Sequence, residues 1–426
     1  MLNKKILFKQ RLKSAISLFL KASNKDTIEA IDKSDVLLYC HDSNRGINLK
    51  NKPYSPLIDS LKDEFESQGY SCITIATPIS KFIGNKGYGN PVAINRGFLI
   101  NYGLNYILKY LGYKPLVAFY EKLFKKADPK FIISIGCNDS FCEAARNLGI
   151  FHAELLHGIG YTPIPWGWDE KEKLNLPQCI LTLDPVSTHT FSNLSDIGVT
   201  IKEIQHPFLK RFDELNIDRL PKEWLPVYNN KSEQKEILIS LQWGHCYEID
   251  GIEIYKDIVE NGLFPKELEH IINLNYLNVL WRFRLHPVLF RQPKKYKKLL
   301  DYINDFVESH SNCEILESTY LPLPAILSSC SGHITLCSMV SYEAAYLGVP
   351  SLALSPILRD CNSDYYHMFD DLVESKHLLK VEPNIDFIIN WLQSVKKTDP
   401  LLNIDNIQEE PENLLHWLLE QTRNNI

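Results

Sequence analysis

The sequence predicts an α/β protein made of two consecutive domains, each a doubly wound parallel sheet. Three observations predict this fold class. Short apolar runs typical of buried strands alternate with helical patterns along most of the 426 residues. A polar, proline-punctuated stretch over 207–236 interrupts the alternation, and a second series of strand-like and helical runs follows it. Strand, helix and strand in series form right-handed crossovers and hence a parallel sheet.

The first series contains several predicted strands with helical patterns between them. One helical pattern, 54–69, ends at Gly69, as helices commonly do. Another begins near Ser140, where Ser140 and Glu143 form a Ser-x-x-Glu capping pattern. The predicted strands are 36–40, 72–76, 131–136, 151–156, 179–183 and 201–205.

The second series again alternates strands with helical segments, and the region 384–424 has helical patterns. Its predicted strands are 237–241, 277–285, 313–316, 333–337 and 351–355. The chain is long enough for two or three domains, so we divide it at the breaks in this alternation. The parts are a basic amphipathic helix (1–34), an N-terminal domain (35–206), a linker (207–236), a C-terminal domain (237–400) and a C-terminal helix (401–426). One possible position for the C-terminal helix is against the N-terminal domain.

Composition narrows the class of protein. The formal net charge of −6 argues against a nucleic-acid partner, since a general binder would be basic. The ten cysteines include no CxxC pair, so we expect reduced core thiols in a cytoplasmic protein. No apolar stretch is long enough to span a membrane, and no signal peptide is recognisable. No HExxH, EF-hand or Cys/His cluster stands out, so we expect no metal and no cofactor.

The first 25 residues combine basic side chains with apolar ones at helical spacing, and no acidic residue precedes Asp26. A basic amphipathic helix of this kind can rest on an anionic membrane surface. That would place the protein at the inner face of the cytoplasmic membrane. The alternative is a helix that packs on the first domain and exposes its basic face to solvent.

The stretch RFRLHP, residues 282–287, is unusual for a strand of a parallel sheet. Because strand side chains alternate, Arg282, Arg284 and His286 share one face of the strand. Such strands are normally covered on both faces and nearly continuously apolar. Ligands of these sheets bind beyond the carboxyl ends of the strands, which is where the three basic side chains converge.

A second candidate site follows the predicted strand 333–337. Ser338 is a natural N-cap for a predicted helix over 339–347. The hydroxyls of Ser338 and Ser341 at this helix N-terminus form a potential anion site, and Glu343 lies one turn further along. The alternative is an ordinary capped helix whose first turn favours an acid.

These motifs together resemble the nucleotide-binding domain of GT-B glycosyltransferases. The matching segments are ILISLQWG (237–244), LHP (285–287) and SMVSYEAAYLGVP (338–350). Within this family the chain resembles bacterial enzymes that build capsule, lipopolysaccharide and teichoic-acid polymers. The resemblance implies two Rossmann-like domains facing across a cleft, a nucleotide-sugar donor bound by the C-terminal domain, and metal-independent transfer.

On this resemblance the donor contacts the strand ends of the C-terminal domain. His286 would bind the phosphate next to the leaving group, and Glu343 would accept hydrogen bonds from a ribose diol. Two arginines exceed what one phosphate needs, so we expect at least one of them to pair with an acid of a neighbouring helix. The implied donor-binding residues are Gln242, Gly244, Arg282, Arg284, His286, Ser338, Ser341 and Glu343.

A short motif in the N-terminal domain, ELLHGIGY (154–161), resembles the catalytic His-Gly of glycerophosphate-polymerising relatives and some capsule enzymes. His157 would then deprotonate the acceptor hydroxyl, because imidazole titrates near neutral pH. Glu154 and Asp42 are reserve catalytic carboxylates, and Arg45 is a candidate acceptor-binding residue. The alternatives are a loop imidazole that caps a carbonyl for His157, and a turn stabilised by polar side chains for Asp42.

The sequence thus predicts a glycosyltransferase that moves a sugar from a nucleotide-activated donor to an oligosaccharide or lipid-linked glycan in bacterial surface-polysaccharide synthesis. Within the same fold, the alternatives are a transferase of CMP-activated sialic acid or Kdo, a CDP-polyol phosphotransferase, and a nucleotide-sugar 2-epimerase. The epimerase would need a cluster of carboxylates that the sequence does not locate. A catalytically inactive nucleotide-binding scaffold is the alternative of another class.

Overall fold

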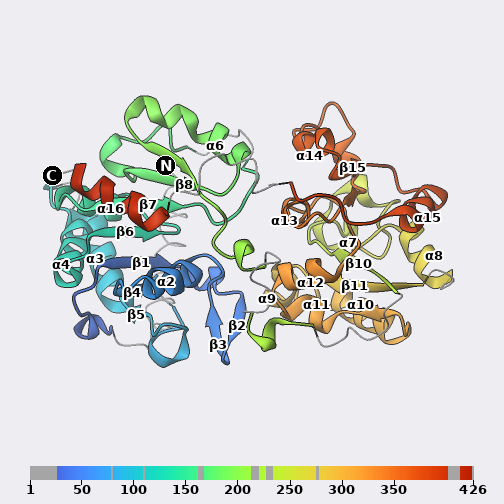
Figure 1. Cartoon of the computed structure of the whole chain (residues 1–426), viewed down its shortest axis with the longest axis horizontal. Helices are drawn as coiled ribbons and strands as arrows, with labels where there is room; N and C mark the ends of the chain where they lie inside the picture. Colours follow the sequence, from blue (N-terminus) through green and yellow to red (C-terminus); the bar gives the residue numbers. More distant parts are fainter. Residues whose placement is uncertain are drawn as a thin grey trace. The chain divides into compact units, whose positions relative to one another are not determined.

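The chain forms two compact units, seen in the computed structural model of Figure 1. Unit 1 comprises residues 1–210 and 409–426, and unit 2 comprises residues 211–408. The predicted helix over 1–25, and part of the predicted linker, lie outside the described residues. The structure describes residues 26–77, 80–108, 111–161, 167–212, 220–226, 234–274, 278–401 and 413–424.

Unit 1 contains a sheet of seven parallel strands in the order β5-β4-β1-β6-β7-β8-β9. Strands β4 and β5 extend the sheet on one side of β1, and β6 to β9 extend it on the other. The switch point, at which open parallel sheets bind ligands, therefore lies between β1 and β6. The strands are β1 (Val36–Cys40), β4 (Cys72–Ala76), β5 (Val92–Ala93), β6 (Phe131–Ser134), β7 (Phe151–Leu155), β8 (Cys179–Thr182) and β9 (Thr200–Glu203).

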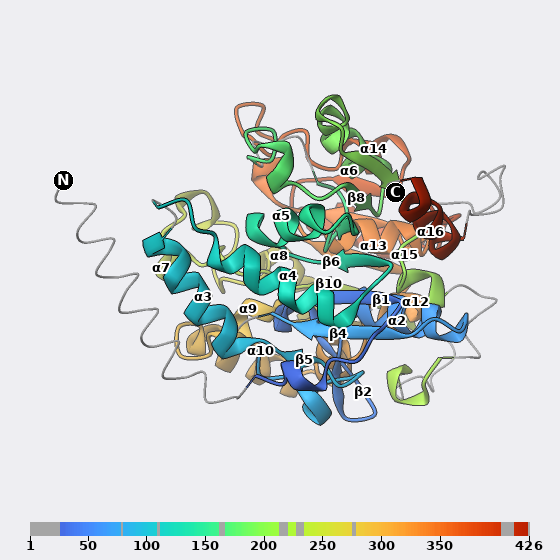
Figure 2. The same ribbon diagram turned by 90° about the vertical axis from the view of Figure 1, so that its left-hand side faces the viewer.

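Helices cover both faces of this sheet. On one face, α3, α4 and α5 pack over the strands (Figure 2). There the rings of Tyr120 and Phe141 lie 5.1 Å apart. On the other face, Trp417 of the C-terminal helix α16 lies 6.2 Å from Phe151 of β7. The α-helices of unit 1 are α2 (Ile58–Ser67), α3 (Asn95–Leu108), α4 (Pro115–Ala127), α5 (Asp139–Asn147), α6 (Pro185–Phe191) and α16 (Leu414–Asn424). The unit also contains the hairpin of β2 (Ile47–Leu49) and β3 (Lys52–Tyr54).

Unit 2 contains a sheet of six parallel strands in the order β12-β11-β10-β13-β14-β15. The first strand, β10, lies between β11 and β13, so the switch point of this sheet is between β10 and β13. The strands are β10 (Lys235–Ser240), β11 (Val279–Arg284), β12 (Cys313–Glu314), β13 (Gly332–Thr335), β14 (Ser351–Ala353) and β15 (Leu378–Lys380).

Successive side chains of the unit 2 strands enter two different cores. Ile237 and Ile239 of β10 pack with α8, α10 and α15, whereas Leu238 packs with α12 and α13. Because strand side chains alternate, these two clusters lie on opposite faces of the sheet. The helices are α7 (Tyr247–Asp250), α8 (Lys266–Leu274), α9 (Pro287–Arg291), α10 (Lys297–Glu308), α11 (Leu316–Tyr320), α12 (Leu323–Ser329), α13 (Val340–Tyr346), α14 (Asp370–Glu374) and α15 (Ile385–Ser394).

The structure confirms the predicted fold class and places each predicted strand within a few residues of its expected bounds. The sequence analysis missed the short edge strands β5 and β15 and the β2–β3 hairpin. The predicted capping box at Ser140 is wrong. The N-cap of α5 is Asn138, whose side chain accepts a hydrogen bond from the backbone N–H of Phe141, and Glu143 pairs with Lys114 instead.

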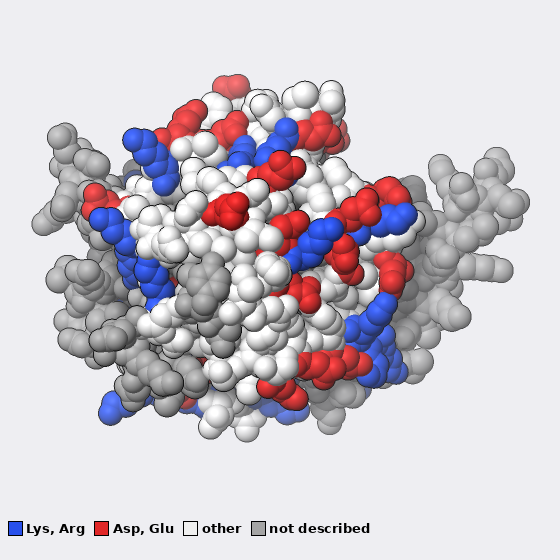
Figure 3. Space-filling view, turned by 90° about the vertical axis from the view of Figure 1, so that its right-hand side faces the viewer, with Lys and Arg blue, Asp and Glu red and all other residues white. Residues whose placement is uncertain are grey.

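Exposed charges of opposite sign are interspersed on the face of the molecule in Figure 3, and no broad patch of one sign is visible there. The exposed ion pairs of unit 2 include Lys266 with Glu260 and Lys297 with Asp301. Among the residues that the structure describes, no helix is long and apolar enough to cross a membrane.

Candidate functional site

At the switch point of unit 2, the side chain of Gln242 connects the loops that follow β10 and β13. The side-chain oxygen of Gln242, two residues after β10, accepts a hydrogen bond of 2.8 Å from the backbone N–H of Cys337, after β13. Gly244 follows in the left-handed region with φ +85°. The predicted donor residues Gln242 and Gly244 therefore lie where an open parallel sheet binds ligands.

Arg284, the last residue of β11, has its charge held beside Glu343 of α13. Its Nη1 donates to the carbonyl oxygens of Ser318, at 2.5 Å, and Leu321, at 3.0 Å. Burial lowers the pKa of Arg284 to about 10, and Glu343 opposes this shift. Burial raises the pKa of Glu343 to about 7, and Arg284 opposes that shift in turn. The guanidinium of Arg284 and the carboxyl of Glu343 thus interact electrostatically near the end of β11.

His286 lies at the mouth of the same strand end, as predicted. It is the N-cap of the short helix α9, and its Nδ1 accepts a hydrogen bond of 3.2 Å from the backbone N–H of Val288. Its ring lies 6.2 Å from that of the exposed Trp243, in the loop after β10. The side chains of His286 and Trp243 thus bring the loops after β10 and β11 together.

The serines after β13 have different environments. Helix α13 begins at Val340, one residue later than expected, so its N-cap is Met339 and the predicted N-cap Ser338 is wrong. The hydroxyl of Ser338 accepts a 3.3 Å hydrogen bond from the backbone N–H of Val340. Ser341 is fully buried, and its hydroxyl has no hydrogen-bond partner among the described residues. Ser338 is therefore the more accessible of the two predicted anion-binding hydroxyls.

Arg282 does not fit the predicted role in donor binding. Its side chain is fully buried, and its Nε lies 2.6 Å from Glu236 of β10. Its Nη1 lies 3.3 Å from Glu314 and 3.5 Å from Glu317. Arg282 and Arg284 lie on the same face of β11, as predicted. At Arg282, however, neighbouring elements cover this face of the strand. Arg282 is the structural arginine of the pair.

His245 is a residue of this site that the sequence analysis missed. It lies at the switch point, with its ring 4.4 Å from that of Tyr255, and burial lowers its pKa to about 4. Its Nδ1 is buried without a hydrogen-bond partner among the described residues. The signal was available in the sequence, because a histidine four residues after an apolar strand lies beyond the strand's carboxyl end.

The raised pKa of Glu343 makes the stability of the protein depend on pH. In the unfolded chain this carboxyl would release its proton near the ordinary value of 4.5, but in the folded protein only near 7. The folded state therefore binds the extra proton between these values, and the free energy of unfolding decreases as pH rises through that window. We expect Glu343→Gln to remove this part of the decrease, as measured by chemical unfolding from pH 4.5 to 8.

A matched control for this prediction is Glu260→Gln, at an exposed position of unit 2. It should keep the pH dependence of the wild-type protein. A Glu343→Gln profile parallel to that of the wild type across the whole range would contradict the assignment.

In unit 1, two loops at the switch point approach each other closely. His41 directly follows β1, and Gly136 follows β6 with φ +78°. A Cβ on Gly136 would lie 2.7 Å from Cδ2 of the His41 ring, so both the backbone conformation and the close approach require glycine here. The sequence analysis considered Asp42 and Arg45 in this loop and missed His41.

His157, the predicted catalytic base, is exposed in the loop after β7. Its Nδ1 lies 2.9 Å from the hydroxyl of Tyr161. Loss of hydration lowers its pKa, and the nearby His41 lowers it further. The neutral imidazole, which is the form that accepts a proton, is therefore favoured near neutral pH.

Glu154 does not reach solvent. It is buried in β7, where it accepts hydrogen bonds from the hydroxyl of Ser134 and, at 2.5 Å, from the backbone N–H of Gly136. Burial raises its pKa, although these hydrogen bonds act in the opposite sense. Glu154 is therefore poorly placed to act as the catalytic base, because its oxygens already bind Ser134 and Gly136.

The two candidates from the loop after β1 also have structural partners. Arg45 is buried and pairs with Asp59 at 2.5 Å, which excludes it from binding an acceptor at the surface. Asp42 accepts hydrogen bonds from the hydroxyl of Ser80 and, at 2.7 Å, from the backbone N–H of Lys81. The alternative of a turn stabilised by polar side chains therefore describes Asp42 best.

No protein-family model matches the chain, and no curated protein matches it. Solved structures do share its fold. UDP-GlcNAc 2-epimerase from Methanocaldococcus jannaschii has a TM-score of 0.53 and 16% identity, over 90% of this chain and 99% of that one. UDP-GlcNAc 2-epimerase from Neisseria meningitidis, bound to UDP-GlcNAc, has a TM-score of 0.51 and 14% identity over the same shares, 90% and 99%.

A putative UDP-N-acetylglucosamine 2-epimerase from Listeria monocytogenes also matches, with a TM-score of 0.52 and 12% identity over 84% of this chain and 88% of that one. At these identities the likeness establishes the fold and nothing finer. The chain is thus an α/β protein of two Rossmann-like domains with a GT-B-like fold.

Proposed function

We propose that the protein is a glycosyltransferase that uses a nucleotide-activated sugar and binds this donor with unit 2. The observation that carries the proposal is the convergence of three strand ends at the switch point of unit 2. There the Arg284–Glu343 pair, the imidazole of His286 and the Gln242 bridge lie together. The GT-B-like fold supports the proposal, since one of the similar structures was solved with UDP-GlcNAc bound.

The donor chemistry suits these groups. A nucleotide diphosphate brings negative charge, which a guanidinium and an imidazole stabilise, most strongly where water is excluded. Arg284 is held by the two carbonyl oxygens that its Nη1 binds, so its position is fixed before the donor arrives. Glu343 would accept hydrogen bonds from a ribose diol when ionised, and Ser338 would contribute a hydroxyl.

The acceptor chemistry is assigned to unit 1. His157 would remove the proton from the acceptor hydroxyl as this oxygen attacks the sugar, and the nucleotide diphosphate would leave with the electrons of the broken bond. The lowered pKa of His157 suits a base that must be neutral near pH 7. The proposed acceptor is an oligosaccharide or lipid-linked glycan of bacterial surface-polysaccharide synthesis. Residues 1–25 would provide contact with an anionic membrane.

Nucleotide binding tests the donor site directly. We expect one nucleotide among CMP, CDP, UDP and GDP to raise the melting temperature of the wild-type protein, and His286→Ala to abolish the shift. A ligand at ~100 times its Kd stabilises the folded state by about 2.7 kcal/mol, enough to detect by thermal shift. The identity of the active nucleotide would also distinguish CMP-sugar and CDP-polyol donors from UDP-sugar donors.

The matched control is His270→Ala, which removes an exposed histidine from α8 in the same unit. It should retain the nucleotide shift. If none of the four nucleotides stabilised the wild-type protein at millimolar concentration, the proposed donor site would be refuted.

A nucleotide-sugar 2-epimerase is the second candidate function. Two observations favour it. The similar structures described above are UDP-GlcNAc 2-epimerases, and unit 1 places two imidazoles, His41 and His157, near each other at its strand ends. Incubation with UDP-GlcNAc alone separates the candidates. An epimerase would invert C2 without any acceptor, whereas a transferase would leave the sugar configuration unchanged.

A further inference from the structure

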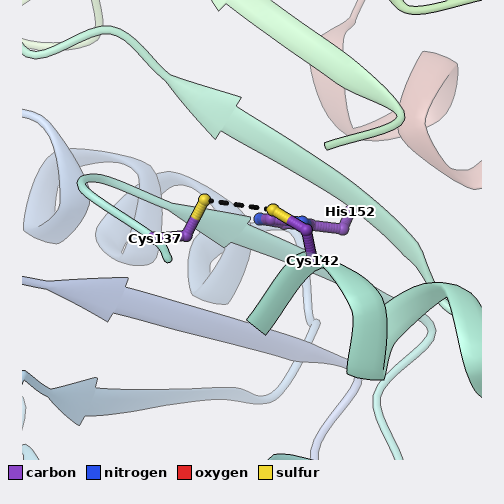
Figure 4. Close-up of side chains that lie close together, drawn as sticks. All are labelled: Cys137, Cys142 and His152. Atoms are coloured by element: carbon purple, nitrogen blue, oxygen red, sulfur yellow. Dashed lines mark hydrogen bonds between the residues drawn. The ribbon is translucent and has the colours of Figure 1, made fainter. Parts of the chain in front are cut away.

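Unit 1 assembles two thiols and an imidazole that are separate in the sequence. Cys137 follows β6, Cys142 lies in the first turns of α5, and His152 lies in β7. Their sulfur and nitrogen atoms all lie within 4.8 Å of one another, and the two sulfur atoms are 3.5 Å apart. Figure 4 shows the sulfurs facing each other and the imidazole ring beside Cys142.

The imidazole of His152 is held as a metal-binding imidazole usually is. Its Nε2 lies 2.7 Å from the hydroxyl of Ser134, which in turn hydrogen-bonds to the carboxyl of Glu154. The hydroxyl of Ser134 donates to the carboxyl of Glu154, so it accepts the Nε2–H of His152. The lone pair of His152 is then on Nδ1. A partner that fixes the far nitrogen in this way is typical of metal-ligating histidines.

The nitrogen that carries this lone pair has no partner of its own. His152 is fully buried, and its Nδ1 makes no hydrogen bond to any described residue. A buried polar atom without a partner costs free energy and calls for an explanation, such as a ligand.

We propose that Cys137, Cys142 and His152 bind a zinc ion through two thiolates and Nδ1 of the imidazole. Zinc–sulfur bonds of about 2.3 Å in a tetrahedral site place two sulfurs ~3.7 Å apart, close to the distance here. Binding replaces the two thiol protons, which pass to solvent, so two thiolates balance the 2+ charge inside the protein. The site is distinct from the proposed donor site, which lies in unit 2.

The sequence analysis expected no metal site because it found no Cys/His cluster. Four residues separate Cys137 from Cys142, which is within the spacing seen for zinc ligands. The third ligand is contributed by the neighbouring strand, since β6 and β7 pair in parallel with His152 opposite Ile132. A bound ion would tie the loop after β6 to β7.

Zinc content and affinity test the proposal on the full-length chain. We expect the wild-type protein, after dialysis against zinc sulfate and removal of loose metal, to retain one zinc per chain. Cobalt in place of zinc should give the intense absorption of thiolate-to-cobalt charge transfer. Cys142→Ser should lose both signals, and Cys179→Ser, which replaces another buried cysteine of unit 1, should keep them.

A wild-type protein that retains no zinc and gives no cobalt–thiolate absorption would overturn the proposal, whatever the variants do. So would a reducible disulfide between Cys137 and Cys142, detected as a mass loss of two hydrogens and assigned to these two residues by peptide mapping. Ser134→Ala provides a second variant that keeps all three ligands. It should weaken zinc binding by ~10–100-fold, because the imidazole loses the group that orients it.

Discussion

His157→Ala is expected to lower the turnover number by about 10²- to 10⁴-fold, the usual contribution of a general base. The affinity for the donor nucleotide should stay at the wild-type value, since the proposed nucleotide site is built from unit 2 residues. A loss of turnover without a loss of binding is the signature of a group that acts in the transition state. The measurement is steady-state kinetics with the donor that the nucleotide panel identifies, beside a thermal shift on the same variant.

The pH profile provides an independent test of the same residue. Because loss of hydration and His41 lower the pKa of His157, the neutral base persists below the ordinary histidine value of 6.5. Turnover should therefore stay level as pH falls toward 6.5 and decline only below it. Replacing His41 by alanine should move this acidic limb to higher pH, because His41 contributes to the lowered pKa of His157.

The control variant is His189→Ala, which removes an exposed histidine from α6 of the same unit. Its turnover should match the wild type. If His157→Ala retained more than about a tenth of the wild-type turnover, His157 would not be the general base. Tyr161, the hydrogen-bond partner of its Nδ1, would then become a candidate for proton transfer.

The architecture was predictable because local sequence and global fold agree over most of the chain. Runs such as Val36–Cys40 and Val279–Arg284 are buried strands of parallel sheets, as predicted. The elements that were missed are short. Strand β5 consists of Val92–Ala93 alone, and two residues carry no readable periodicity.

The site was predictable only where a residue type and a strand end coincide. Arg284 and His286 satisfy both conditions. Arg282 has the same sequence pattern as Arg284, but its partners Glu236 and Glu314 are brought to it by other strands. No local signal distinguishes the two arginines, because the difference between them is the burial imposed by neighbouring elements.

The cluster of Cys137, Cys142 and His152 could not be predicted from local sequence either. Cys142 has an ordinary sequence context, an apolar helix face, and was counted among the core thiols. What makes it distinctive is the parallel pairing of β6 with β7, which places His152 beside it. A pattern that depends on strand register cannot be seen until the strand order is known.

The environment of Arg282 implies a large effect on stability. One buried guanidinium compensates carboxylates from β10, β12 and α11. Glu236 also accepts a hydrogen bond of 2.7 Å from the hydroxyl of Ser329, and Glu314 accepts them from the backbone N–H groups of Glu317 and Ser318. These hydrogen bonds hold the carboxylates of Glu236 and Glu314 in place beside the arginine.

Arg282→Met is accordingly expected to lower the free energy of unfolding by about 3–5 kcal/mol, because it leaves three partly buried carboxylates without a countercharge. Chemical unfolding followed by circular dichroism measures the change. Lys297→Met, which breaks an exposed pair with Asp301 on α10, should cost less than about 1 kcal/mol. Adding Glu236→Gln to Arg282→Met should recover part of the loss, since it removes one uncompensated charge. If Arg282→Met were as stable as the Lys297→Met control, the arginine would not hold the acids together, and its role in donor binding would have to be considered again.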